Sequence, residues 1–250
     1  MVKIVLTGAT GFIGSEILEQ CLTNRSIHHI YCLTRRALDE KYSTHPKVTQ
    51  VQHDNFDDLP DHLFERFRGW GVGGCIWALG SPVNAHASLE EAQKTGISYP
   101  VQAAEKFARI CAPEYMETQT GSYIYPFRFI FMSFWGAEEN QFRSLWLWGD
   151  TRRIKGAAEK GLFETMDGSE VIDGKKCLDV ISLRVGGVLA KGDAMTKMFA
   201  MGTVPSITVD RLAKTAIHKC WLGDPDHRRV LENADVLGED WAMVNTIHAT

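Results

Sequence analysis

Three glycines within seven residues, directly behind a short apolar run, constrain the fold of this chain more than any other feature. They are Gly8, Gly11 and Gly14, in the string KIVLTGATGFIGSE near the start of the chain. The residues before them, Val2 to Leu6, have the β-branched, apolar character of a buried strand. The residues from Ile13 to Leu22 place apolar side chains at helical spacing, which predicts a helix packed on one side.

A strand, a glycine turn and a helix in this order predict a dinucleotide-binding site. Gly8 lets the chain reverse tightly, Gly11 leaves room for a ligand at the backbone, and Gly14 lets the helix lie close to the strand. The free N–H groups and the positive dipole end of the helix suit a pyrophosphate. The spacing is Gly-x-x-Gly-x-x-Gly rather than the commoner Gly-x-Gly-x-x-Gly, and a tight turn without a ligand is the alternative. We expect the cofactor to contact Gly8, Thr10, Gly11, Phe12, Ile13 and Gly14.

Composition narrows the class of protein. A chain of 250 residues with 44% hydrophobic and 23% charged residues is ordinary for a soluble globular protein. The net charge of −4 argues against a general nucleic-acid binder, and no apolar run approaches the length of a membrane span. The first strand leaves no room for a signal peptide, so we expect a cytoplasmic protein. Six scattered cysteines without CxxC pairing predict reduced core thiols, and no metal constellation is evident.

Strand-like and helix-like segments alternate along the rest of the chain, which predicts an α/β fold. We expect a single doubly wound domain over residues 1–250, Rossmann-like, with a mostly parallel sheet of about seven strands and insertions near 113–126 and 137–150. The later strands are predicted at Ile30–Leu33, Val48–Gln52, Gly74–Leu79, the string PFRFIFMSF and Leu178–Leu183, with a helix-like stretch at Leu89–Ala112.

The end of the second strand bears on the type of dinucleotide. An NAD-preferring fold places an acidic residue about 20 residues past the glycines, to hold the ribose 2′-hydroxyl. Here the sequence reads Thr34-Arg35-Arg36, with no carboxylate before Asp39. Two guanidinium groups beside a hydroxyl suit a 2′-phosphate, so NADP(H) is predicted and NAD(H) is less favoured. A solvated basic turn is the alternative.

Several strings together resemble the extended and atypical members of the short-chain dehydrogenase/reductase superfamily, including its small Tat-interacting-protein-like reductases. TGATGFIG resembles the start of these proteins, and TRRIKGAAEKGL resembles the helix that carries their active-site lysine, here Lys155. ISLRVGGVLA resembles the loop usually written Arg-Pro-Gly, with Val185 in place of proline. ITVDRLAKTAIHKCWL and VLENADV resemble the late helix and the closing strand, so the resemblance covers nearly the whole chain.

This resemblance implies further cofactor contacts. Asp54 and Asn55 stand where an Asp and a small polar residue contact the adenine, although a turn cap is the alternative. WALGSPVNA resembles the loop along which the middle of the cofactor lies. The resemblance also implies that Lys155 binds the nicotinamide ribose. The implied contacts are Asp54, Asn55, Ala78, Leu79, Gly80, Lys155, Val185 and Gly186.

The catalytic residues depart from the resembled pattern. Those enzymes use a tyrosine four residues before the lysine as an acid, and here that position is Thr151, whose hydroxyl is far less acidic. Ser133 keeps the role of the serine that positions a carbonyl, or else Phe134 occupies that place. Substitute proton donors are Tyr99, Asp150, His86, Tyr123 and Tyr125. Tyr99 is alternatively a core or surface tyrosine, and Asp150 a helix cap. The catalytic candidates are therefore Lys155, Ser133, Thr151, Tyr99 and Asp150.

Three functions remain open on this pattern. The first is an NADP(H)-dependent oxidoreductase acting on a small carbonyl metabolite. The second is a non-redox isomerase, dehydratase or cyclase, and the third is an NADP-sensing regulatory module without catalysis. Trp135, Phe142, Trp146 and Trp148 predict an aromatic pocket for a flat or polycyclic substrate, unless these rings complete the core. The expected partners are a small-molecule substrate and a second copy of the chain paired through the late helices, with no nucleic acid and no membrane.

Overall fold

Seven parallel strands form the central sheet of the computed structural model, which describes residues 1–121, 123–192 and 205–238. The strand order is β11-β8-β5-β4-β1-β2-β3, and every neighbouring pair is parallel. The strands are β1 (Val2–Thr7), β2 (Ile27–Thr34), β3 (Val48–Gln52), β4 (Gly74–Trp77), β5 (Phe127–Phe134), β8 (Leu178–Val185) and β11 (Val230–Glu232).

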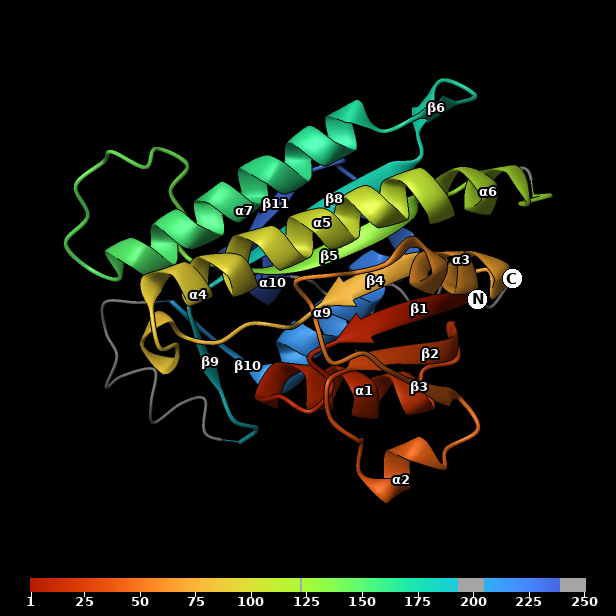
Figure 1. The fold of residues 1–250 in the computed structure, drawn as a ribbon, viewed down its shortest axis with the longest axis horizontal. Helices are drawn as coiled ribbons and strands as arrows, with labels where there is room; N and C mark the ends of the chain where they lie inside the picture. Colours follow the sequence, from red (N-terminus) through yellow and green to blue (C-terminus); the bar gives the residue numbers. More distant parts are fainter. Residues whose placement is uncertain (122, 193–204, 239–250) are drawn as a thin grey trace.

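Helices cover both faces of this sheet (Figure 1). One layer packs α1 against α9, and the other packs α5 against α7. The apolar core is accordingly divided by the sheet into two clusters, one under each helix layer. The helices are α1 (Phe12–Thr23), α2 (Glu40–Ser43), α3 (Asp61–Gly69), α4 (Leu89–Gln93), α5 (Tyr99–Lys106), α6 (Ala112–Glu117), α7 (Gly149–Gly168), α9 (Val209–Leu222) and α10 (Asn233–Gly238).

Two widened turns interrupt the long helical run from α4 to α6. These π-helical segments are η2 (Lys94–Ser98) and η3 (Phe107–Cys111). Pro100 follows the first segment and Pro113 follows the second. A proline ring clashes with the carbonyl four residues back in a regular helix, and a π turn relieves that clash. The run therefore continues past both prolines, five residues beyond the predicted end at Ala112.

Short strands lie outside the main sheet. The strands β6 (Val171–Ile172) and β7 (Lys175–Lys176) form an antiparallel hairpin after α7. Its turn residues, Asp173 and Gly174, both have positive φ, as a two-residue hairpin loop requires. A parallel pair, β9 (Gly187–Leu189) and β10 (Ser206–Thr208), follows β8 beside the carboxyl end of the sheet.

The prediction of a single doubly wound domain is confirmed. The sheet reverses its direction of winding between β1 and β4, which lie side by side although two strands separate them in the sequence. Ligands of doubly wound folds bind at the carboxyl ends of the strands, beside such a reversal point. The six cysteines are buried and unbonded to one another, which confirms their prediction as core thiols. Within the described ranges, no helix is long and apolar enough to span a membrane.

Candidate functional site

The glycine turn joins β1 to α1 at the reversal point of the sheet. Gly8 has a φ of +69°, and a Cβ there would lie 2.5 Å from the Ala78 carbonyl oxygen at the end of β4. A Cβ on Gly14 would lie 2.0 Å from the Gly8 carbonyl oxygen, so α1 can approach the turn only with glycine at that position. Gly11 caps α1, and its backbone N–H donates to Gly8 O at 2.8 Å. The turn is therefore built for close backbone packing.

Three cavities continue from this turn along the carboxyl edge of the sheet, and Leu79 lines all of them. We name them by position. The arginine cavity, about 250 Å³, contains Gly8 to Gly11 and the end of β2. The Asp54 cavity, about 180 Å³, extends from it toward α5. The central cavity, about 420 Å³, lies between the ends of β4, β5 and β8. The three cavities therefore adjoin one another at Leu79, and together we call them the glycine cleft.

Arg35 and Arg36 follow β2 at the wall of the arginine cavity. Both side chains are exposed, and the Gln52 and Gln50 amides donate to their backbone carbonyls at 3.4 Å. The hydroxyl of Thr34 beside them is buried and lacks a hydrogen-bond partner. A phosphate or a ribose could accept hydrogen bonds from these two exposed guanidinium groups and from the buried hydroxyl that lacks a partner. The residues here fit the predicted cofactor.

Tyr99 lies in the Asp54 cavity, together with Asp54, Asn55 and Asp57. Burial raises the pKa of its hydroxyl, and the neighbouring carboxylate of Asp57 raises that pKa further. Tyr99 does not line the central cavity. The structure therefore does not bring Tyr99 together with Lys155 in the central cavity, and its role as a substitute proton donor stays a prediction. Asp54 and Asn55 lie where an adenine is expected.

Lys155 extends from α7 into the central cavity. Its Nζ donates to the Met132 carbonyl oxygen at 2.7 Å and lies 4.5 Å from the centre of the Phe131 ring. Burial lowers the pKa of this amine to about 8, against the attraction of Glu159, which raises it. The amine is held at the end of β5, where it can both donate hydrogen bonds and act as a cation at neutral pH.

Ser133 and Phe134 both reach the central cavity from the end of β5. The Ser133 side chain is 6% exposed, and its hydroxyl lacks a hydrogen-bond partner. Burying a hydroxyl without a partner is costly, so natural proteins rarely keep one unless a ligand or water completes it. Phe134 meets Trp148 edge to face, with ring centres 5.9 Å apart. Ser133 therefore supplies a hydroxyl that can donate a hydrogen bond, and Phe134 forms part of the apolar wall of the cavity.

Thr151 and Asp150 differ in their relation to this cavity. Thr151 lies one helical turn before Lys155 and lines the central cavity with it. Asp150 does not line that cavity and instead pairs with Arg153 at 3.3 Å, with 58% of its side chain exposed. The structure therefore does not place Asp150 in the central cavity, and its role as a proton donor stays a prediction. The N-cap of α7 is Trp148, which has a left-handed backbone and makes no side-chain capping bond, so the alternative of a capping aspartate is wrong.

Most of the remaining residues that were expected to contact the cofactor line one of these cavities. Ile13, Ala78, Leu79, Gly80, Val185 and Gly186 line the central cavity, and Thr10 lines the arginine cavity. Phe12 lines neither of these cavities and is 55% exposed. Sequence reasoning missed Ser81, Pro82 and Val188 in the central cavity. Ser81 and Pro82 immediately follow Gly80 in the string WALGSPVNA, which was assigned to the cofactor loop. Their place in that string is the signal that could have identified them.

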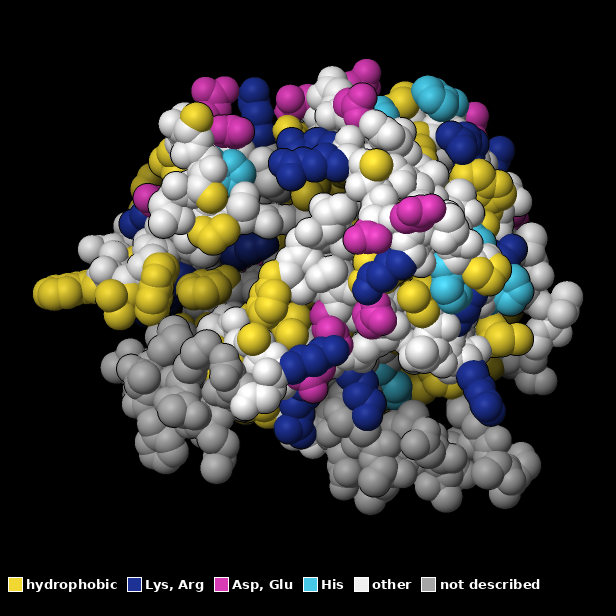
Figure 2. Space-filling model, turned by 90° about the horizontal axis from the view of Figure 1, so that it is seen from below, with side chains coloured by type: hydrophobic (Ala, Val, Ile, Leu, Met, Phe, Trp, Pro, Cys, Tyr) yellow, Lys and Arg dark blue, Asp and Glu magenta, His cyan; other side chains and the backbone are white. Residues whose placement is uncertain are grey.

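The aromatic pocket predicted from the segment before α7 is largely absent. Of its four rings, only Trp148 lines the central cavity. Phe142 and Trp146 are each 98% exposed, and hydrophobic side chains project from one end of the molecule in Figure 2. Trp135 is half-buried but does not line the cavity. The apolar wall comes instead from Ile13, Leu79, Pro82, Met132, Phe134, Trp148, Val185 and Val188.

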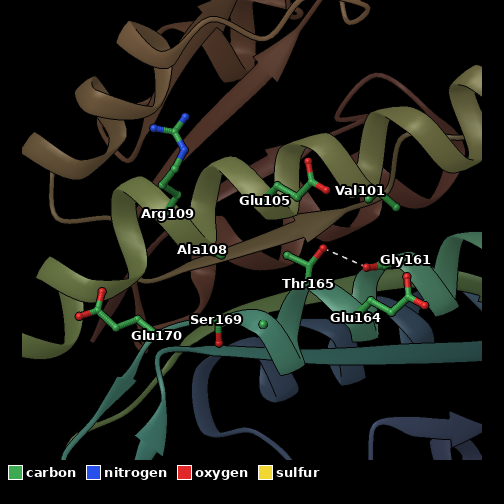
Figure 3. A pocket seen from close by; sticks show the side chains of 10 residues that line it. Val101, Glu105, Ala108, Arg109, Gly161, Glu164, Thr165, Ser169 and Glu170 are labelled. Atoms are coloured by element: carbon green, nitrogen blue, oxygen red, sulfur yellow. Dashed lines mark hydrogen bonds between the residues drawn. The ribbon is translucent and has the colours of Figure 1, made fainter.

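A wider groove, about 590 Å³, lies between α5 and α7 at the other end of α7 from Lys155 (Figure 3). Small residues and carboxylates dominate its lining, including Glu105, Glu164 and Glu170. Arg109 at its edge is bound to both carboxylate oxygens of Asp61 at 2.8 Å. The groove shares no residue with the glycine cleft, so size alone does not mark the functional site here.

Ser133→Ala should leave the protein as stable as wild type or raise its free energy of unfolding by about 1 kcal/mol, because it removes a buried hydroxyl without a partner. Urea unfolding followed by circular dichroism measures this. Ser182→Ala is the matched control, since that buried hydroxyl donates to Glu159 at 2.6 Å and its loss should destabilise the fold. A larger loss for Ser133→Ala than for Ser182→Ala would show that Ser133 has an internal partner.

Comparisons with known proteins agree with the fold. A sequence model of a family described as male sterility protein matches residues 6–68, from the end of β1 into α3. Comparison with curated proteins by sequence finds no match. The structure of Gre2 from Candida albicans in complex with NADPH has a TM-score of 0.65 at 13% identity, covering 93% of this chain and 78% of that one.

Other solved structures resemble the chain to a similar degree. Carbonyl reductase Sniffer of D. melanogaster has a TM-score of 0.65 at 16% identity, covering 94% of this chain and 97% of that one. Vestitone reductase from alfalfa has a TM-score of 0.59 at 16% identity, covering 90% and 74%. At such identities the likeness shows the fold alone. The predicted Rossmann-like fold is confirmed by these neighbours.

Proposed function

We propose that this protein is an NADP(H)-dependent oxidoreductase that reduces the carbonyl group of a small apolar compound. One observation carries the proposal: Lys155 and Ser133, whose hydroxyl is unpartnered, line the same cavity, which adjoins the cavity at the glycine turn. The named activities of two structural neighbours, a carbonyl reductase and vestitone reductase, support the same class of reaction. The neighbour in complex with NADPH supports the choice of cofactor class.

The residues present fit the cofactor along the cleft. The backbone of Gly8 to Gly11 suits the pyrophosphate, and Arg35 with Arg36 suits a 2′-phosphate. Lys155 and the loop after β4 border the place left for the nicotinamide ribose. When bound there, the nicotinamide would supply the hydride. Ser133 then holds the carbonyl oxygen with its hydroxyl, and the Lys155 cation favours the negative charge that develops on that oxygen.

The shape of the central cavity indicates the class of substrate. Its lining is mainly apolar, and Phe134 with Trp148 forms one aromatic corner. The volume of about 420 Å³ must hold the reacting end of the cofactor as well as the substrate. We therefore propose a small carbonyl compound with a planar or aromatic part that lies against this corner.

Replacing both arginines should reverse the preference between the two cofactors. We expect wild type to bind NADPH more tightly than NADH. The double variant Arg35→Ala/Arg36→Ala should lose about a hundredfold to ten-thousandfold in NADPH affinity, since each of the two lost charge-assisted bonds costs about 1.5–3 kcal/mol. NADH affinity should change little. Calorimetric titration of both cofactors against both proteins measures this.

Arg25→Ala is the matched control, because this exposed arginine lies outside the three cavities of the cleft. Equal affinity of wild type for NADPH and NADH would refute the role of the arginines. NADPH absorbance followed with product formation tests the reaction class. Conversion of substrate without NADPH consumption would favour an isomerase, dehydratase or cyclase, and cofactor binding without either signal would favour a sensor.

A further inference from the structure

We propose that Ser81 and His86 together supply the proton that the missing tyrosine would otherwise give, an inference that rests on the proposed reductase function. The two side chains are hydrogen-bonded, with Ser81 Oγ 2.7 Å from His86 Nε2. Ser81 lines the central cavity with Ser133 and Lys155. Ser81 therefore lines the same cavity as the two groups that we propose to hold the carbonyl.

The loop after β4 has the geometry to form this pair. A short 3-10 turn, η1 (Val83–Ala85), folds the chain back, with Ala85 N–H donating to Pro82 O at 2.9 Å. His86 N–H donates to Val83 O at 3.2 Å, which brings the imidazole over the start of the loop. His86 lines a small side cavity that adjoins the central one and shares Ser81, Thr151 and Lys155 with it.

The other candidate donors are not placed for this role. Tyr99 occupies the Asp54 cavity, and Asp150 is exposed and paired with Arg153. Tyr123 and Tyr125 precede β5, whereas Ser133 lies near its carboxyl end, so these two rings are at the opposite edge of the sheet. Thr151 lines the cavity, but an aliphatic hydroxyl alone is a weak acid. Ser81 has the same weakness and differs in having a histidine behind it.

With a reduced nicotinamide cofactor bound, the carbonyl carbon would accept its hydride, which oxidises the cofactor, and the electron pair of the C=O π bond would move onto oxygen. That oxygen takes the proton of Ser81 Oγ, and Ser81 recovers one from the Nε2–H of protonated His86. His86 is half-buried, so its neutral ring can regain a proton from solvent. The products are an alcohol and the oxidised cofactor.

Two charged groups face this pair from the packed helices. Lys155 reaches the side cavity from α7 and titrates with a pKa of about 8. Glu91 on α4 accepts a hydrogen bond from Ala87 N–H at 2.9 Å, beside His86 in the sequence. Both must be considered in any pH profile.

The test compares His86→Gln and Ser81→Ala with wild type, using NADPH and 9,10-phenanthrenequinone as the probe carbonyl. We expect kcat to fall about a hundredfold or more in each variant, the usual contribution of a general acid. NADPH affinity should stay unchanged by fluorescence titration. In the pH profile, His86→Gln should keep the alkaline limb near pH 8 that Lys155 contributes. His62→Gln, an exposed histidine on α3, is the matched control and should keep full activity.

A second readout does not depend on turnover. The imidazole of His86 is followed by NMR, with its resonance assigned by its loss in His86→Gln. Ser81→Ala should shift the titration midpoint of this resonance, and an unchanged midpoint would overturn the pairing. If wild type reduces the probe and both variants keep full activity, the role of Ser81 and His86 in proton transfer is overturned, but the proposed reductase function is not. A wild-type protein that consumes no NADPH with this probe would overturn the proposed function and, with it, the role of the pair.

Discussion

Gly14→Ala should lower the free energy of unfolding by about 3 kcal/mol or more and abolish NADPH binding, the largest loss of stability that we expect from one methyl group. The added Cβ would lie 2.0 Å from Gly8 O, 2.5 Å from Gly8 C and 3.0 Å from Ala9 N. All three atoms are backbone, so no side chain can rotate away to make room. Either α1 moves off the sheet or the turn opens. Urea unfolding and NADPH titration measure the two losses.

Alanine substitutions at two other glycines serve as controls, because they distinguish a loss of close packing from a loss of cofactor binding. Gly168→Ala adds a methyl group where no atom lies within 4 Å, and it should raise stability by about 0.5–1 kcal/mol through helix propensity. Gly11→Ala meets only Gly8 O at 3.2 Å, so its cost in stability should be under about 1 kcal/mol. It should nevertheless weaken NADPH binding, since the methyl group stands where the pyrophosphate approaches. A Gly14→Ala protein as stable as wild type would contradict the close packing of α1.

Lys155→Met should reduce turnover at least a hundredfold while making the fold more stable. Its pKa falls from 10.5 to about 8 on folding, which corresponds to about 3 kcal/mol of lost stability at neutral pH. The variant removes that penalty and gives up one hydrogen bond to Met132 O, worth about 1 kcal/mol. We therefore expect a net gain of roughly 1–2 kcal/mol at pH 7. Urea unfolding and NADPH consumption measure both changes.

The gain should depend on pH with a definite sign. Between pH 8 and 10.5 the unfolded chain keeps the Lys155 proton and the folded chain has lost it. Stability contributed by this group therefore rises with pH across that window, and the advantage of Lys155→Met shrinks there. Lys160→Met is the matched control, because that exposed lysine forms only a loose pair with Glu164 at 3.9 Å. It should change stability by at most about 0.5 kcal/mol. A destabilised Lys155→Met would mean that the amine is not strained by burial.

Local signals in the sequence were sufficient to predict the fold. The β-branched run at Val48–Gln52 predicts its strand with the observed bounds, and the glycine spacing predicts the turn between β1 and α1. The hairpin at Val171–Lys176 was missed, although its Asp-Gly pair is a strong hairpin signal. These features depend on neighbours in the chain, so periodicity and turn chemistry reveal them.

The candidate site was less predictable because it depends on how distant segments face one another. The π turn before Tyr99 sets the rotation of α5, and no propensity shows which cavity that ring will reach. The loop holding Phe142 and Trp146 has no periodic pattern, so the sequence could not show that both rings are exposed. The pairing of Ser81 with His86 depends on the fold-back at η1. Sequence identified His86 as a candidate but could not supply its partner.

The six buried thiols can be used to follow where this protein unfolds locally. Three of them, Cys75, Cys111 and Cys177, lie in the core cluster under α5 and α7. Cys21, Cys32 and Cys220 lie in the cluster under α1 and α9. A water-soluble alkylating reagent can reach a thiol only when its cluster opens, and the thiolate is the reactive form. Mass spectrometry of briefly alkylated protein would thus report which side of the sheet yields first.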